Sequence, residues 1–384
     1  MNTLIYWFRN DLRLHDNAAF SQAAAQADTL LPVYCLSSAS AIHNGESRWG
    51  VMPPSMHRQR VLLDSLIDLD AQLRAMGSAL SVAYGSPADL LPKLARAVDA
   101  CAIHCESIAA THEQSELDDL QHTGIEVVSS WQSTLFEPEA LPFKVQNLPA
   151  VYTEFRRALA RAQVAPVAPL PAPAQLPPLP GTAHACATLN LADQLANLGD
   201  NSAEPRSSVP CWQAEFAGGE RAGLAHLARY FASESPRHYK ATRNALTGTD
   251  FSSKLSGWLA SGALSVRQVA QAISHCEQRM GPTEGTEWLL LELLWRDYFR
   301  LLHLQYGAKL FRYRGLRDKV PPVPPGLRPS WSTTTSTTTR ATGSTLPAWA
   351  PTRAAGGALT CKSRRKTMTP AKVTRSYGNR YELK

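Results

Sequence analysis

The sequence predicts an α/β protein with an N-terminal doubly wound parallel sheet, a proline-rich connector and an all-helical second domain. Up to residue 134, short apolar runs alternate with amphipathic segments, which is typical of a parallel sheet covered by helices. Residues 162–180 are dominated by proline and alanine, which favours an extended surface segment. From residue 218 to 309 apolar residues recur at helical spacing, without a strand pattern.

In the first domain, buried strands are expected to alternate with helices. The strands are expected at residues 4–8, 30–36, 79–84, 102–104 and 125–128. The helices between them are expected at residues 18–27, 58–76, 89–98 and 114–122. Ligands of such sheets bind beyond the carboxyl ends of the strands, so residues that follow a strand are candidate site residues.

The second domain is expected to begin at Gly218 and Gly219, which precede an apolar-periodic helix that starts at Glu220. Further helices are expected at residues 256–263, 265–280 and 286–306. The predicted domain map is an α/β domain at 1–134, an extended connector at 135–217, a partial helical domain at 218–315 and an aberrant low-complexity basic tail at 316–384.

The composition fits a globular protein, because 44% of the 384 residues are hydrophobic. No apolar run approaches the length that spans a bilayer, and the first apolar strand begins at Leu4. We therefore expect no membrane segment, no leader peptide and a cytoplasmic location. The net charge of +7 does not indicate nucleic-acid binding, because residues 329–384 hold ten of the 39 Lys/Arg and one of the 32 Asp/Glu. Residues 1–328 thus have 29 basic and 31 acidic residues and are slightly acidic.

The seven cysteines lie at scattered positions, which argues against a disulfide framework. Cys101 and Cys105 flank His104 and could suggest a metal site, but no second cluster of ligands lies nearby in the sequence. The favoured interpretation is buried strand cysteines and no metal.

A short hydroxyl-rich segment is a candidate phosphate site. Ser252, Ser253, Lys254, Leu255 and Ser256 are consecutive at the expected start of a helix. Hydroxyls and free backbone N–H groups at a helix N-terminus bind anions, and the helix dipole adds to the attraction. The alternative is an ordinary serine N-cap before an exposed lysine.

A second candidate site lies on the helix expected at 286–306. Trp288, Glu292, Trp295 and Arg296 are spaced so that they share one helix face. Two indoles, a carboxylate and a guanidinium on one helix face are more typical of a functional site than of a hydrophobic core. The alternative is a helix–helix contact with an internal pair between Glu292 and Arg296.

Together these segments resemble the photolyase/cryptochrome family of light-driven flavoproteins. Residues 6–17 read Tyr-Trp-Phe-Arg-Asn-Asp-Leu-Arg-Leu-His-Asp-Asn, which is similar to the DASH-type cryptochromes of that family. The resemblance extends from Met1 to about Gly315. It implies an N-terminal antenna-type domain and a helical FAD-binding domain that is incomplete here.

The resemblance implies two cofactors. FAD would be held through its phosphates by residues 252–256, with Tyr239 and Arg296 as further contacts. A folate antenna, 5,10-methenyltetrahydrofolate, is also implied, and Glu106 after the fourth strand lies where an antenna-contacting carboxylate is expected. A solvated loop acid is the alternative for Glu106. The residues from Arg9 to Arg13 would line the antenna site or form a network between the domains.

The resemblance also implies the activity, which is blue-light-driven repair of cyclobutane pyrimidine dimers, preferentially in single-stranded DNA, by a monomer. Glu292 and Trp295 would be catalytic, and Trp288 and Arg296 would join them in contacting the flipped lesion. Two alternatives remain open. One is a flavin photoreceptor that signals without repair, and the other is a non-functional product that holds no flavin.

The tail departs from the family. Residues 333–339 read Thr-Thr-Thr-Ser-Thr-Thr-Thr, and the tail has almost no periodic apolar pattern. A shift of the reading frame by one base turns threonine codons into codons for Asp, Tyr, Asn or His, and serine codons into codons for apolar residues. The run can then spell a segment close to the family's late flavin-contacting sequence. We therefore expect a deletion and a frame shift in the C-terminal part, with a genuine divergent tail as the alternative.

Resequencing the 3′ half of the gene tests this expectation. A family-like continuation should appear in another frame, because the composition of the tail cannot support a packed core. Reads that confirm the given frame, with no such continuation, would contradict the expectation.

Overall fold

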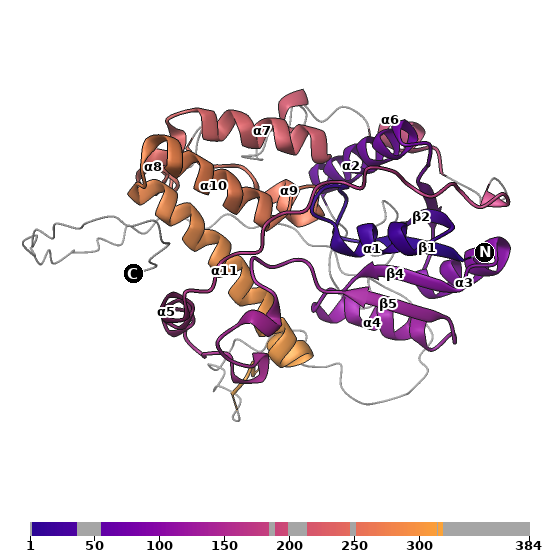
Figure 1. The fold of residues 1–384 in the computed structure, drawn as a ribbon, viewed down its shortest axis with the longest axis horizontal. Helices are drawn as coiled ribbons and strands as arrows, with labels where there is room; N and C mark the ends of the chain where they lie inside the picture. The colour runs from indigo at the N-terminus through magenta and orange to yellow at the C-terminus, as the bar shows by residue number, and fades with distance from the viewer. Residues whose placement is uncertain are drawn as a thin grey trace, which may run out of the picture. The chain divides into compact units, whose positions relative to one another are not determined.

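The computed structural model describes residues 2–36, 55–183, 189–198, 213–245, 251–312 and 314–317. A first compact unit comprises the described residues up to 312. Every helix and strand named below belongs to the first unit (Figure 1). Apart from residues 316 and 317, the predicted tail lies outside the described residues.

A parallel sheet of five strands forms the N-terminal part, in the order β3-β2-β1-β4-β5. All pairs are parallel, and Ile5 of β1 lies beside Leu31 of β2 and Ile103 of β4. This confirms the doubly wound α/β prediction. The strands are β1 (Thr3–Phe8), β2 (Thr29–Leu36), β3 (Ser81–Tyr84), β4 (Ala102–Glu106) and β5 (Glu126–Ser130).

Helices connect the strands and cover both faces of the sheet. They are α1 (Ala18–Gln26), α2 (Met56–Ala75), α3 (Pro87–Val98) and α4 (Thr111–Gln121). Alternate residues of β1 point to opposite faces, so Tyr6 and Phe8 join the core under α1 and α2, whereas Ile5 and Trp7 join the core with α3 and α4. The central strand is buried throughout, which explains its uninterrupted apolar run.

The region predicted as an extended connector contains regular structure as well. Helices α5 (Tyr152–Ala162) and α6 (Leu191–Asn197) form within residues 135–217. The proline-rich stretch between them is extended, as predicted, and is tied to the sheet domain by backbone bonds. Asp16 N–H donates to Leu170 O over 2.8 Å, and Leu30 N–H donates to Pro178 O over 3.1 Å.

The C-terminal part of this unit is helical. It contains α7 (Glu220–Ala232), α8 (Ser235–Thr242), α9 (Ser256–Ser261), α10 (Val266–Met280) and α11 (Glu284–Tyr306). No strand occurs in the described stretches 213–245 and 251–312, which agrees with the prediction. Capping boxes start two of these helices, formed by Ser265 with Gln268 in α10 and by Thr283 with Thr286 in α11.

The hydrophobic core of the helical part includes residues that precede it in the sequence. Leu135 and Phe136, just after the sheet, pack with Phe155 of α5 and with Leu293 and Leu294 of α11. Residues 135–159 therefore belong to the helical core in packing terms. Figure 1 shows α11 running beside α5, α8 and α10.

Among the described residues, no helix is both long and apolar enough to cross a membrane.

One glycine fixes how closely the sheet part and the helical part approach. Gly262 ends α9 with φ +71°, and a Cβ atom there would lie 1.7 Å from the backbone oxygen of Asn10. A side chain at this position would force the loop after β1 away from α9. Gly281 after α10 has a similar φ of +78°, but a Cβ atom there would meet open space, with no neighbouring element within 4 Å.

The pair of glycines gives a matched test of this approach. Gly262→Ala should lower the free energy of unfolding by about 3 kcal/mol or more, because backbone strain and a steric clash add. Gly281→Ala should cost about 1–3 kcal/mol, the strain alone, because φ +78° with ψ 155° is a backbone conformation that is essentially confined to glycine. Urea unfolding of both variants measures the difference, and equal losses would show that the contact with Asn10 is not tight.

Candidate functional site

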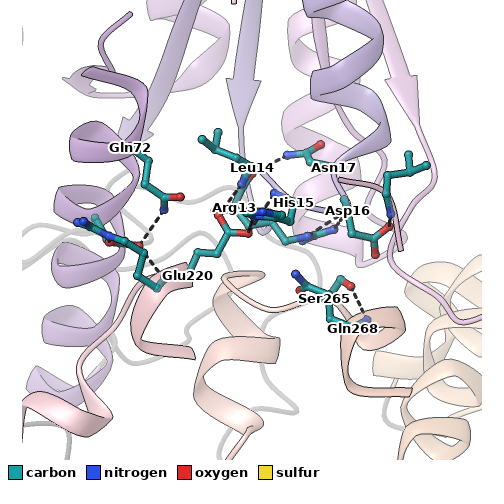
Figure 2. A network of polar contacts seen from close by, with 12 residues as sticks. Arg13, Leu14, His15, Asp16, Asn17, Gln72, Glu220, Ser265 and Gln268 are labelled. Atoms are coloured by element: carbon teal, nitrogen blue, oxygen red, sulfur yellow. Dashed lines mark hydrogen bonds and ion pairs between the residues drawn. The ribbon is translucent and has the colours of Figure 1, made fainter. Parts of the chain in front are cut away.

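The loop after β1 meets the start of α7 through a buried carboxylate. Glu220, which is fully buried, accepts the backbone N–H of Leu14 over 2.8 Å and that of His15 over 3.0 Å. Its Oε1 also lies 2.9 Å from His15 Nδ1 (Figure 2). As the first residue of α7, this carboxylate also faces the positive end of the helix dipole. It therefore joins the sheet part to the helical part.

Asp11 organises the inside of the same loop. Its Oδ1 accepts the backbone N–H of Arg9 over 2.8 Å. Its Oδ2 accepts the hydroxyl of Tyr6 over 2.5 Å and the amide of Asn17 over 3.1 Å. The amide of Gln132, beyond β5, donates to the same oxygen over 3.2 Å. All five residues are buried, so their polar groups satisfy one another instead of water.

Two arginines extend this network across the junction. Arg13 Nη1 donates to the carbonyl of Gly262 over 2.9 Å, and its Nη2 donates to the carbonyl of Asp16 over 2.7 Å. Arg267 of α10 donates from Nε to the carbonyl of Thr134 over 2.9 Å. Of the two interpretations left open for residues 9–13, these contacts support the network between domains.

Glu106 ends β4 at the topological switch point, beside the residues that follow β1. Arg9 Nη1 donates to its backbone carbonyl over 3.3 Å. The side chain is buried, and its Oε2 has no hydrogen-bond partner among the described residues. Burial first, and the nearby charge of Asp11 second, raise the pKa of Glu106 to about 7. The alternative of a solvated loop acid is therefore wrong.

The N-terminal half of α11 pairs with α8. Arg243 Nη1 donates to Glu292 Oε1. The guanidinium carbon of Arg243 lies 5.0 Å from the ring centroid of Trp288, and Lys240 Nζ lies 5.2 Å from it. Tyr239 is buried in the same helix, and burial raises its pKa, with the charge of Glu292 as the next cause. Tyr239, Trp288 and Glu292 are thus brought together.

The internal pair between Glu292 and Arg296, which was the alternative interpretation of this helix face, is not formed. Arg296 Nη1 instead donates to the carbonyl of Ser133 over 2.6 Å, and the neighbouring Asp297 accepts the N–H of Leu135 over 2.7 Å. Burial, followed by the charge of Arg300, lowers the pKa of Arg296 to about 9. The contacts of Arg296 lie at the junction with the sheet part. They give no support to its assignment as a flavin and DNA contact.

Trp295 lies in an aromatic stack that is partly open to solvent. Its ring is stacked on Tyr152 of α5, with centroids 3.6 Å apart and planes 13° apart. Phe299, one turn further along α11, stacks at 5.6 Å and 26°. Trp295 is 37% exposed and Phe299 is 53% exposed. Tyr152 is held in place because its hydroxyl donates to Leu291 O over 2.9 Å.

The predicted phosphate segment is only partly as expected. Helix α9 begins at Ser256 but has only six residues, and no side chain caps its start. Lys254 is only 6% exposed, with φ +54° and Nζ at 3.6 Å from the ring centroid of Phe251. The alternative of an exposed lysine is therefore wrong. Burial lowers the pKa of this ammonium. Residues 246–250, just before the segment, lie outside the described residues.

Two residues of the site were not found from the sequence. Tyr152 lies in a region interpreted as a connector, although Tyr152, Phe155 and Leu159 already show helical spacing. His226 of α7 donates from Nε2 to Ser253 O over 2.8 Å, and no sequence motif marked it. Only the fold brings these side chains to Trp295 and to the phosphate segment.

The cysteines near β4 differ in burial. Cys105 is buried as predicted, whereas Cys101 is exposed because it precedes the strand. No group of three or more His, Cys, Asp or Glu side chains within the described ranges could hold a metal ion.

Comparison with known proteins gives consistent matches. The sequence model of the DNA photolyase family matches residues 4–174. Cryptochrome DASH of Gloeobacter violaceus is 37% identical over 323 residues, covering 82% of this chain and 62% of that protein. Cryptochrome DASH of Vibrio parahaemolyticus is 33% identical over 319 residues, covering 83% of this chain and 67% of that protein.

Solved structures agree with these matches. The crystal structure of a Synechocystis cryptochrome superimposes with a TM-score of 0.73 at 34% identity, covering 82% of this chain and 64% of that chain. A class III photolyase from Agrobacterium tumefaciens shares the fold, with a TM-score of 0.64 at 23% identity over 80% of this chain and 60% of that chain. This chain therefore spans roughly three fifths of the length of several of these proteins.

The contact between His15 and Glu220 should make stability depend on pH. The hydrogen bond from Glu220 is the largest cause of the raised pKa of His15 in the folded protein. The stabilisation is therefore fully present below the unfolded pKa of about 6.5 and is lost as pH rises through the higher folded value. Urea midpoints at several pH values should show that the advantage of wild type over His15→Gln shrinks as pH rises.

An exposed histidine serves as the control for this titration. Among the described residues, His122 Nδ1 contacts the carbonyl oxygen of Asp118 one turn earlier, away from Glu220, so His122→Gln should follow the wild-type pH curve. Parallel curves for wild type and His15→Gln would show that the His15 contact does not contribute.

Proposed function

Because this chain belongs to the photolyase/cryptochrome family, as a DASH-type member, we propose that it repairs cyclobutane pyrimidine dimers with FAD and blue light, preferentially in single-stranded DNA. One observation carries the proposal. Trp295 presents a partly exposed aromatic ring one helical turn from the carboxylate of Glu292. A ring and an acid at this spacing suit a flipped base, which requires a stacking surface and a hydrogen-bond partner.

The residues around Lys254 fit the phosphates of FAD. Lys254 is only 6% exposed, its Nζ lies over the ring of Phe251, and no carboxylate among the described residues forms an ion pair with it. A buried cation requires a negative partner, which a diphosphate would supply. Ser252, Ser253 and Ser256 would add hydroxyl donors beside it, and Leu255 would pack beneath them.

When bound, the reduced flavin supplies the light-driven electron that opens the dimer and recovers it afterwards. The remaining steps belong to side chains of this chain. Tyr152 stacks on one face of the Trp295 ring and fixes its orientation. The stacking surface for a base is therefore preorganised. Arg243 holds one oxygen of the Glu292 carboxylate, which leaves the other oxygen to accept a hydrogen bond from an N–H group of a base. Trp288, packed under Arg243 and Lys240, completes this face.

We further propose that a folate, 5,10-methenyltetrahydrofolate, serves as the antenna near Glu106. The support is the unpaired Oε2 of Glu106, which would accept a hydrogen bond from the amino group of a pterin. The location at the switch point of a doubly wound sheet agrees with this role, because ligands of such sheets bind there.

Single-stranded oligothymidylate that carries dimers tests the function. The purified protein with FAD should reverse the dimers under blue light and not in the dark. Flavin binding without reversal would favour the photoreceptor alternative. Absence of flavin binding would favour a non-functional product. Either outcome would overturn the repair proposal.

Two substitutions in α11 should separate recognition from chemistry. Trp295→Ala should weaken binding to dimer-containing strands by about 1–3 kcal/mol, the value of one stacked base, and should barely change binding to undamaged strands. Glu292→Ala should lower the repair yield more than the affinity. Phe311→Ala, which removes an exposed ring elsewhere in the same unit, is the control and should change neither. Equal loss for Trp295→Ala and Phe311→Ala would contradict the assignment.

A further inference from the structure

We propose that His226 is a positioning residue that fixes the backbone of residues 252–256 in a shape that accepts the diphosphate of the cofactor. This inference rests on the proposed flavin function and deepens it. His226 lies on α7, outside the segment that would touch the phosphates.

The hydrogen bonds of His226 determine which ring nitrogen holds the proton. Nε2 lies 2.8 Å from the carbonyl oxygen of Ser253, and Nδ1 lies 3.3 Å from Nη2 of Arg229. A carbonyl only accepts and a guanidinium only donates, so Nε2–H donates to Ser253 and Nδ1 accepts from Arg229. Burial, the largest influence, lowers the pKa of His226 and favours this neutral form.

Aromatic neighbours hold the imidazole in place. The ring of Trp258 lies 4.9 Å away at 27°, and that of Phe216 lies 5.2 Å away at 49°. The side chain is buried, so it cannot exchange its Ser253 contact for water. The orientation of the Nε2–H group is therefore fixed, and it points toward the peptide group between Ser253 and Lys254.

This contact sets the direction of the next amide. The peptide is trans, so its N–H points opposite to its carbonyl, and the N–H of Lys254 points away from His226. No acceptor for this N–H lies among the described residues. Lys254 has φ +54°, whereas Leu255 has the right-handed angles φ −73° and ψ −12°. Successive residues of opposite hand turn their N–H groups to one side and form an anion-binding nest.

The conformation of Lys254 requires an external restraint. A residue with a Cβ atom avoids positive φ, and neither a glycine nor an asparagine stands here to relieve it. The hydrogen bond from His226 supplies that restraint on one side of the segment. The buried ammonium of Lys254 supplies the attraction for an anion on the other.

Two variants of one residue test the role. His226→Phe keeps an aromatic ring between Trp258 and Phe216 but removes the donor, so FAD affinity should fall about tenfold, the size of one lost hydrogen bond. His226→Gln keeps a donor at a similar reach and should bind within about twofold of wild type. Flavin fluorescence titration measures both affinities, and thermal unfolding without FAD checks that the folds are comparable.

Each outcome decides the inference. Equal FAD affinity for His226→Phe and wild type would overturn it, and so would a loss in His226→Gln as large as in His226→Phe, because both would indicate that the donor is irrelevant. If the wild type binds no FAD, the proposed function fails, and pyrophosphate decides the inference separately. Pyrophosphate should then shift the amide NMR signals of Lys254 and Leu255 in wild type and His226→Gln but not in His226→Phe. No shift in the wild type would refute the nest.

Discussion

The burial of the loop at residues 9–17 against the helices is the constraint on which the rest of this compact unit depends. The loop follows the central strand β1, so it lies at the carboxyl ends of the strands. There it contacts α7, α9 and α10. Its backbone and side chains lose water there and must find protein partners. The carboxylate of Glu220 satisfies two amides at once, and a missing partner would cost about 1–3 kcal/mol. A buried network whose polar groups are satisfied makes the junction rigid and favours a single docked arrangement.

This docking determines where α11 lies, and α11 serves three different neighbours along its length. Its first turns face α8, through the pairing of Glu292 with Arg243. Its middle faces the sheet part, through Arg296 and Asp297. Between them, Trp295 faces outward against Tyr152. The proposed base-binding surface therefore takes its position from buried polar contacts on the same helix, less than two turns away.

The two candidate cofactor regions differ in how they are held. Glu106 is buried at the switch point near Arg9, Arg13 and Arg300. Its pKa is raised because burial removes the water that would stabilise the charged carboxylate. The segment at residues 252–256 is a short irregular stretch whose one left-handed residue, Lys254, depends on its neighbours. In the first region one oxygen of the Glu106 carboxylate has no partner among the described residues, and in the second the ammonium of Lys254 has no carboxylate partner among them.

The positions of most helices and strands could be predicted from the amino-acid sequence. Helix positions followed from the 3.6-residue spacing of apolar residues, and strand positions followed from short uninterrupted apolar runs, because both patterns depend only on consecutive residues. The sequence also placed Glu106 at the end of a strand, Glu220 at a helix start, and Trp288, Glu292, Trp295 and Arg296 on one face. The helix at Tyr152–Ala162 was missed because it is short and adjoins a proline-rich stretch that dominates the pattern.

The partners of these side chains could not be predicted from the sequence, because they depend on how distant elements pack. A shared helix face does not say which neighbouring element will cover it, so Glu292 binds Arg243 rather than Arg296, and Trp295 stacks on Tyr152. The burial of Lys254 and its contact with Phe251 likewise depend on how the chain after α8 packs. Periodicity is a local property of consecutive residues, whereas these contacts join residues distant in sequence, and packing alone selects them.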